Sequence, residues 1–241
     1  MIEINMLKKV SFKGYTLIEG FPSSGLVGPI SIGYLISKLG LEYAGFISSD
    51  EFPPIVSIHQ GVPLPPIRIY YSEKYKIVTI FAEINPIAEK SLYDVLDSVY
   101  KFIKDNGIEQ IISISEIPTK DETNKVYAIA SNQRMKEMAK NSNMEEIVDG
   151  VAAGLSALLI ARATIDNLSD INILVPIVPG GAVDPKYAEI ALKSISKLLR
   201  IEIDLTELEA EAKAVESKTK NLIKKRKENN NPFDDSQSMY V

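Results

Sequence analysis

The chain has 241 residues and a net charge of −5, with 45% hydrophobic and 24% charged residues, which suits one substantial globular domain with an appendage and is too polar for a membrane protein. The absence of cysteine excludes disulfides, thiolate metal sites, iron–sulfur clusters and cysteine nucleophiles. Because His59 is the single histidine, a multi-histidine zinc site is excluded as well.

The first half of the chain is predicted to contain a strand, a glycine-rich turn and a helix, followed by four more strands. A short apolar run at residues 15–19 precedes the turn at 20–25, and apolar residues at helical spacing continue to Gly40. Four strand-like segments then lie between proline-rich turns, at residues 43–48, 55–59, 67–72 and 76–84.

The second half alternates more regularly between helix and strand. Helices are predicted at residues 88–105 and 150–163, each leading to a strand, at 110–115 and 172–178. Asp184 is a good N-cap and Pro185 suits a first helical position, so a further helix is predicted from there to about residue 199. Nearly continuous apolar strands between helices predict a three-layer α/β/α domain with a mostly parallel sheet.

The pattern changes after residue 203. Apolar and small residues spaced by three and four in turn form a heptad seam that predicts one long C-terminal helix; they are Leu205, Leu208, Ala212, Val215, Thr219 and Leu222. The seam needs a cover, either the body of the same chain or the helix of a neighbouring copy, and the second choice predicts an oligomer. The expected organisation is an α/β domain at 1–203, a C-terminal helix at 204–228 and a disordered tail at 229–241.

Glycine-rich loops and strand-end carboxylates are the features most typical of a small-molecule site. The loop at 21–28 lacks the Lys-Ser/Thr of a phosphate-binding loop and the spacing of a dinucleotide loop, so a tight turn is favoured over a phosphate site. The loop at 179–182 is treated in the same way. The acidic residues near predicted strand ends form no recognisable acid–base pair and are interpreted as solvated loop carboxylates; they are Glu83, Glu116, Asp121 and Glu122.

Other binding classes receive little support. His59 lies in an apolar strand-like segment, where a structural role is favoured over a catalytic one. The basic run at 224–227 has no interleaved aromatic residues in a chain of charge −5, so no nucleic-acid partner is expected. No apolar run approaches the roughly 20 residues of a membrane span, and residues 1–12 do not resemble a signal peptide. A cytoplasmic protein without cofactor, metal or membrane partner is expected.

The last three residues, Met239-Tyr240-Val241, differ from the polar segment that they end. Tyrosine combines a rigid apolar ring with a hydrogen-bonding tip, and aromatic anchors are enriched among interface hot spots. A terminal carboxylate adds a charge that a lysine or backbone amides can capture. The trio is therefore predicted to bind a pocket on a partner.

Three segments of the chain resemble the proteasome assembly chaperone 2 family in its archaeal form. They are residues 20–28 with sequence GFPSSGLVG, residues 50–54 with sequence DEFPP, and Pro179-Gly180-Gly181. The resemblance covers most of residues 1–200, and the long C-terminal helix and the terminal hydrophobic-Tyr-X (HbYX) motif at Met239, Tyr240 and Val241 extend it to the end of the chain. The glycine-rich turn departs from the family pattern at Ser23-Ser24.

The resemblance implies a chaperone or activator that needs no ATP. In the family the terminal motif enters pockets between neighbouring α-subunits of the proteasome core particle, and members form homo-oligomers, either tetramers or pentamers. A rival hypothesis from another class is a small-molecule α/β enzyme, a hydrolase or a ligase relative, whose tail is only disordered. Removal of Met239 to Val241 separates the two, because it should abolish proteasome binding and spare an enzymatic activity.

Overall fold

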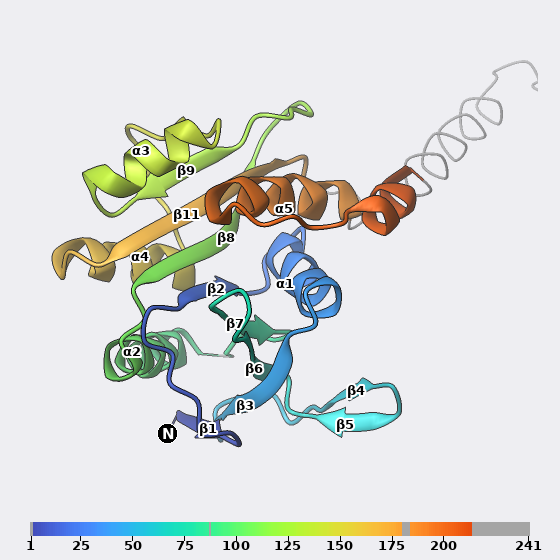
Figure 1. Ribbon diagram of the computed structural model, residues 1–241, viewed down its shortest axis with the longest axis vertical. Helices are drawn as coiled ribbons and strands as arrows, with labels where there is room; N and C mark the ends of the chain where they lie inside the picture. The colour runs from blue at the N-terminus through green and yellow to red at the C-terminus, as the bar shows by residue number, and fades with distance from the viewer. Residues whose placement is uncertain (1, 87, 180–183, 214–241) are drawn as a thin grey trace, which may run out of the picture.

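The strands of the computed structural model, which describes residues 2–86, 88–179 and 184–213, form one sheet of nine and one of two (Figure 1). The large sheet has the order β1-β3-β6-β7-β2-β8-β11-β9-β10. Its strands are β1 (Glu3–Met6), β2 (Thr16–Gly20), β3 (Glu42–Ser48), β6 (Ile67–Ser72), β7 (Ile77–Ala82), β8 (Gln110–Pro118), β9 (Tyr127–Ala130), β10 (Glu145–Glu146) and β11 (Ser169–Ile177). The two-stranded sheet pairs β4 (Ser57–His59) with β5 (Val62–Leu64).

The centre of the large sheet is parallel. β7, β2, β8 and β11 run in the same direction, and β8 and β11 pair over nine residues of each strand. On one side β6 is antiparallel to β7, β3 to β6 and β1 to β3, and on the other β9 is antiparallel to β11. Only residues 73–76 connect β6 to β7, and a connection this short forces antiparallel pairing. The predicted α/β fold is confirmed, with antiparallel strands added at its flanks.

Helices cover both faces of the sheet, as predicted. The helices α1 (Val27–Lys38), α3 (Gln133–Asn141) and α5 (Pro185–Leu199) pack on one face, and α2 (Glu89–Asn106) and α4 (Leu155–Ile165) pack on the other. Successive residues of β2 show the alternation, because Leu17 belongs to the core under α2 and α4 and Ile18 to the core under α1 and α5.

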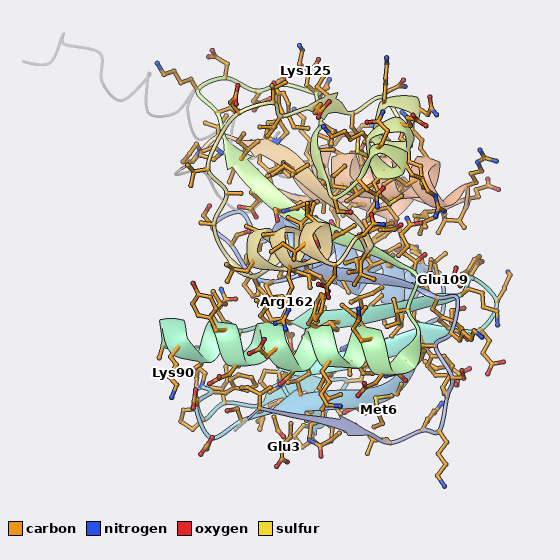
Figure 2. The ribbon with its side chains drawn as sticks, turned by 90° about the vertical axis from the view of Figure 1, so that its left-hand side faces the viewer. Glu3, Met6, Lys90, Glu109, Lys125 and Arg162 are labelled. Carbon is orange, nitrogen blue, oxygen red and sulfur yellow. The ribbon has the colours of Figure 1, made fainter. Side chains whose placement is uncertain are left out.

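Contacts between α2 and α4 tie the second helical layer together. Arg162 of α4 forms an ion pair with Asp97 of α2, and its guanidinium carbon lies 4.3 Å from the centroid of the Tyr100 ring (Figure 2). The Tyr100 hydroxyl donates a hydrogen bond to Asp166 at the end of α4. Burial, followed by this carboxylate, raises the pKa of Tyr100 to about 12, so the ring stays neutral at physiological pH.

The predicted helix start at Asp184 is confirmed. The Asp184 side chain accepts a hydrogen bond of 2.9 Å from the Lys186 amide, and α5 begins at Pro185. By contrast, α4 begins at Leu155 rather than 150, because Gly154 has a φ of 91° that a helix does not contain. In the part of the chain that the structure describes, no helix is both long and apolar enough to span a bilayer.

Candidate functional site

The predicted partner-binding residues Met239, Tyr240 and Val241 lie outside the described residues, as do Val215, Thr219 and Leu222 of the heptad seam and Gly180-Gly181 of the second glycine loop. The tail at 229–241 and most of the predicted helix at 204–228 therefore stay predictions. The structure describes the segment that leads into them, residues 203–213, of which 206–213 are helical. We call this segment the root.

The root is fixed to the body at its beginning. The side chain of Asp204 caps the helical turn, because its Oδ1 accepts hydrogen bonds from the Thr206 amide at 3.0 Å and from the Thr206 hydroxyl at 2.6 Å. The hydroxyl of Tyr34 in α1 donates a hydrogen bond of 2.8 Å to the Asp204 carbonyl. These contacts place the start of the root beside α1.

Apolar burial and ion pairs continue along the root. Leu208 is only 1% exposed, and Leu205 packs against the same core under α1 and α5. Lys38 of α1 pairs with Glu207 at 2.7 Å, and Lys193 of α5 pairs with Glu209 at 3.3 Å. Two covers were predicted for the heptad seam. The part of the seam that the structure describes is covered by the body of the same chain.

The glycine-rich loop after β2 is filled by an internal carboxylate. Glu116 on β8 accepts hydrogen bonds from the amides of Gly25 at 2.8 Å and Val27 at 2.9 Å, and from the Ser24 hydroxyl at 3.3 Å. These donors lie at the N-terminus of α1, where Leu26 has a left-handed φ of 53° and gives no side-chain cap. The interpretation of Glu116 as a solvated loop carboxylate is wrong, because it caps α1 where a bound anion would otherwise lie.

The tight-turn interpretation of this loop is confirmed by a close backbone approach. A Cβ atom added at Gly28 would lie 2.8 Å from the backbone of Gly20, and one added at Gly20 would lie 2.6 Å from Gly28. These distances are too short for any side chain. Both glycines are needed so that the start of α1 can pack against the end of β2.

Glu83 was also interpreted as a solvated carboxylate; it is exposed, and in addition it forms an ion pair. It pairs at 2.8 Å with Arg68, whose side chain is only 4% exposed and whose guanidinium carbon lies 4.9 Å from the centroid of the Phe81 ring. A buried guanidinium needs such a partner, since an unpaired charge would be costly there. The interpretation holds for Asp121 and Glu122, which are exposed.

A cavity of about 320 Å³ lies at the carboxyl ends of β2 and β8, the position at which α/β folds hold their ligands. Phe21, Asn85, Ser115, Gly154 and Ser156 contribute to its lining. The described residues contain no group of three or more histidine, aspartate or glutamate side chains placed to hold a metal ion. The cavity offers hydroxyl, amide and apolar groups, and the carboxylate of Glu116 also lies in its wall.

His59 lies elsewhere, as the last residue of β4, where it is exposed. The predicted strand end is thus correct. The structure places it in the small sheet, away from the cavity.

Two buried acids were missed by sequence reasoning. Glu19 in β2 and Asp170 in β11 are both 0% exposed. Burial raises the pKa of the Glu19 carboxyl, and hydrogen bonding toward Ser113 and Ser156 lowers it by less. Burial, and then the charge of Glu19, raises the pKa of Asp170 well above its usual range, so both groups favour the protonated form. Each acid lies within a strongly apolar strand, a signal that could have identified them.

The model of a protein family described as the PAC2 family matches residues 17–223. Two uncharacterized proteins of Methanocaldococcus jannaschii are similar in sequence. One is 28% identical over 215 residues, covering 89% of this chain and 87% of its own length. The other is 25% identical over 212 residues, covering 83% and 80%.

Solved structures share the fold over almost the whole chain. Pyrococcus furiosus PbaA, described as an archaeal homolog of proteasome-assembly chaperone, superposes with a TM-score of 0.84 at 22% identity, covering 94% of this chain and 93% of its own. Pyrococcus furiosus PbaB, described as an archaeal proteasome activator, has a TM-score of 0.78 at 23% identity, covering 92% and 98%.

Proposed function

This chain belongs to the PAC2 family, and from that premise we propose that it is a non-enzymatic homologue of proteasome assembly chaperones and activators, which binds the proteasome core particle in the cytoplasm without using ATP. The family match over residues 17–223 carries the proposal. The likeness of its fold to PbaA and PbaB, whose names refer to the proteasome, supports it.

Binding is proposed to reside in the C-terminal trio. Tyr240 would place its ring in a pocket between two α-subunits of the core particle, with Met239 adding apolar contact and the Val241 carboxylate binding a cationic group. An aromatic anchor and a terminal charge give orientation as well as affinity, so a very short segment can be specific.

The root supports this proposal by fixing where the tail would begin. Capping at Asp204 and burial of Leu208 hold residues 203–213 against the body. With the predicted helix rising about 1.5 Å per residue over 214–228 and the tail at 229–241 extending about 3.4 Å per residue, the chain beyond the root can span at most roughly 65 Å. This reach is enough for the trio to contact a pocket on a large partner while the body stays on its surface.

A three-residue segment binds weakly, and a homo-oligomer, a tetramer or a pentamer, would compensate. When several tails belong to one particle, each docking event after the first becomes intramolecular, and avidity can exceed the affinity of a single tail by roughly a hundredfold or more. We therefore propose that self-association and tail docking act together.

Deletion of Met239 to Val241 tests the proposal. The truncated chain should fail to retain the α-subunit or the core particle in a pull-down, whereas the intact chain retains them. Addition of one residue after Val241 should also be damaging, because it displaces the carboxylate. Retention of the core particle by both altered chains would remove the tail from the mechanism.

A further inference from the structure

The small sheet is a hairpin that extends away from the body. β4 and β5 pair only with each other in the described chain, and Figure 1 shows them projecting from the body at the lower right. The turn between them is the two-residue type, in which Gln60 and Gly61 have φ values of 50° and 79°. An isolated two-stranded sheet is marginally stable in water, so it gains from further pairing.

The hairpin exposes apolar side chains to an unusual degree. The exposed fractions are 51% for Ile55, 65% for Val56, 75% for Ile58 and 54% for Val62. They make up four of the eleven exposed large hydrophobic residues of the described chain. Residues 52–67 contain no aspartate, glutamate, lysine or arginine. A surface of this kind indicates a site of protein contact.

Contacts at the base of the hairpin determine which face is free. The Ser57 hydroxyl donates a hydrogen bond to Glu83, the carboxylate that pairs with Arg68 at the edge of the body. Side chains alternate along a strand, so Ile58 points to the face opposite Ser57. Ile58 lies across from Pro63, and these two side chains share the outer face.

The two edges of the hairpin differ in what they offer. In a hairpin with a two-residue turn the pair next to the turn exchanges hydrogen bonds, so the following pair, Ile58 and Pro63, directs its backbone groups outward. Proline has no N–H, which leaves the outer edge of β5 without a donor at its centre. The outer edge of β4 offers both the N–H and the C=O of Ile58.

We propose that the β4 edges of two copies of this chain pair antiparallel about a two-fold axis at Ile58, so that Ile58 of one copy lies across from Ile58 of the second. Antiparallel pairing of one strand with itself is self-complementary, as a two-fold interface requires. Copies with a net charge of −5 repel each other, and an uncharged segment is where they can meet with least repulsion. The inference rests on the homo-oligomer of the proposed function in its tetrameric form, since a ring of five copies has no two-fold axis, and it names one interface of that tetramer.

The absence of cysteine makes a direct test possible. In an Ile58→Cys variant every disulfide joins two copies, because the chain has no other thiol. Under mild oxidation this variant should form covalent dimers at least tenfold faster than Ile165→Cys, whose position at the end of α4 is 84% exposed. Equal rates for the two variants would contradict the proposed axis.

The mass of the oligomer in solution tests whether the hairpin holds two copies together. Ile58→Lys places like charges near the axis and should yield a smaller particle than wild type by light scattering, whereas Ile165→Lys should leave the mass unchanged. Both positions are exposed, so circular dichroism should report an intact fold in each variant.

The outcomes separate this inference from the proposed function. If wild type is an oligomer and Ile58→Lys has the same mass, the proposed hairpin interface is wrong. The proposal that the tail docks on the core particle then still stands. If that variant keeps its mass but no longer binds core particle, the hairpin contacts the core particle and not a second copy. If wild type is a monomer at micromolar concentration, the interface and the oligomer both fail.

Discussion

Glu19 and Asp170 are acids in the interior of the sheet, where ionisation is costly. Neither carboxyl oxygen of Asp170 has a hydrogen-bond partner in the described chain. Because burial raises both pKa values, the native state holds protons that the unfolded chain releases above a pH of about 4. The contribution of these groups to stability is full below that pH and is lost as the pH rises toward the native pKa values.

We therefore expect Glu19→Gln to be more stable than wild type near neutral pH. The amide has nearly the shape of the protonated acid and cannot ionise, so the gain should increase between pH 5 and pH 8. Thermal unfolding of both proteins across this range measures the effect. A difference in melting temperature that is independent of pH would contradict the assignment of Glu19 as a protonated buried acid.

Glu116 stabilises α1 through a contact between residues far apart in the chain. Glu116→Ala removes an acceptor from the Gly25 and Val27 amides, and loss of an N-terminal cap costs about 0.5–2 kcal/mol. In a chain of this size that corresponds to roughly 1–8 °C in melting temperature. Glu116→Gln keeps one acceptor oxygen and should lose less. Equal stability of Glu116→Ala and wild type would show that the cap is unimportant.

Among the helices and strands, the sequence predicted best those with a clear hydrophobic periodicity and with proline or capping residues at their ends. β6 and α5 match their predicted ranges because prolines precede β6 and a capping Asp184 precedes α5. The helix α3 was missed because its mean hydropathy is low, with only Met135 and Ala139 buried. Strands β1, β5, β9 and β10 were missed because they have two to four residues each, too short for a periodic signal.

The candidate site was predictable only in part. Glycines marked the turn after β2, but the residue that fills it comes from a strand 91 positions away, a pairing that no local pattern contains. The partners of Glu83 are also distant in the sequence or on another strand. The terminal trio could be predicted because it is a local motif, and it stays a prediction because it lies outside the described residues.

The packing of α1 onto β2 gives a matched pair of predictions within one helix. Gly28→Ala places a methyl group 2.8 Å from the Gly20 backbone, so it should destabilise the fold by about 1–3 kcal/mol, as overpacking does. Gly33→Ala meets Phe81 at an ordinary 3.6 Å and should stabilise α1 by roughly 0.5–1 kcal/mol. Urea unfolding compares the two variants. Equal effects would contradict the proposed role of the close approach.

For the whole molecule, the described residues form the body, and the trio proposed to bind lies outside them. The nine-stranded sheet and its two helical layers hold the root against α1 and α5, and the hairpin projects from the body at a distance from the root (Figure 1). In this account the body positions several tails, the hairpin joins copies, and the trio provides the specific contact.

The most direct measurement compares Tyr240→Ala with Phe233→Ala in binding to immobilised core particle. Both changes remove one aromatic ring from residues 229–241, but only Tyr240 belongs to the terminal motif. Loss of an anchor costs about 2 kcal/mol or more at each docked tail, so Tyr240→Ala should weaken binding by at least thirtyfold. Phe233→Ala should bind within about twofold of wild type, a difference of roughly 0.4 kcal/mol. Binding of Tyr240→Ala as tight as that of wild type would contradict the docking mechanism.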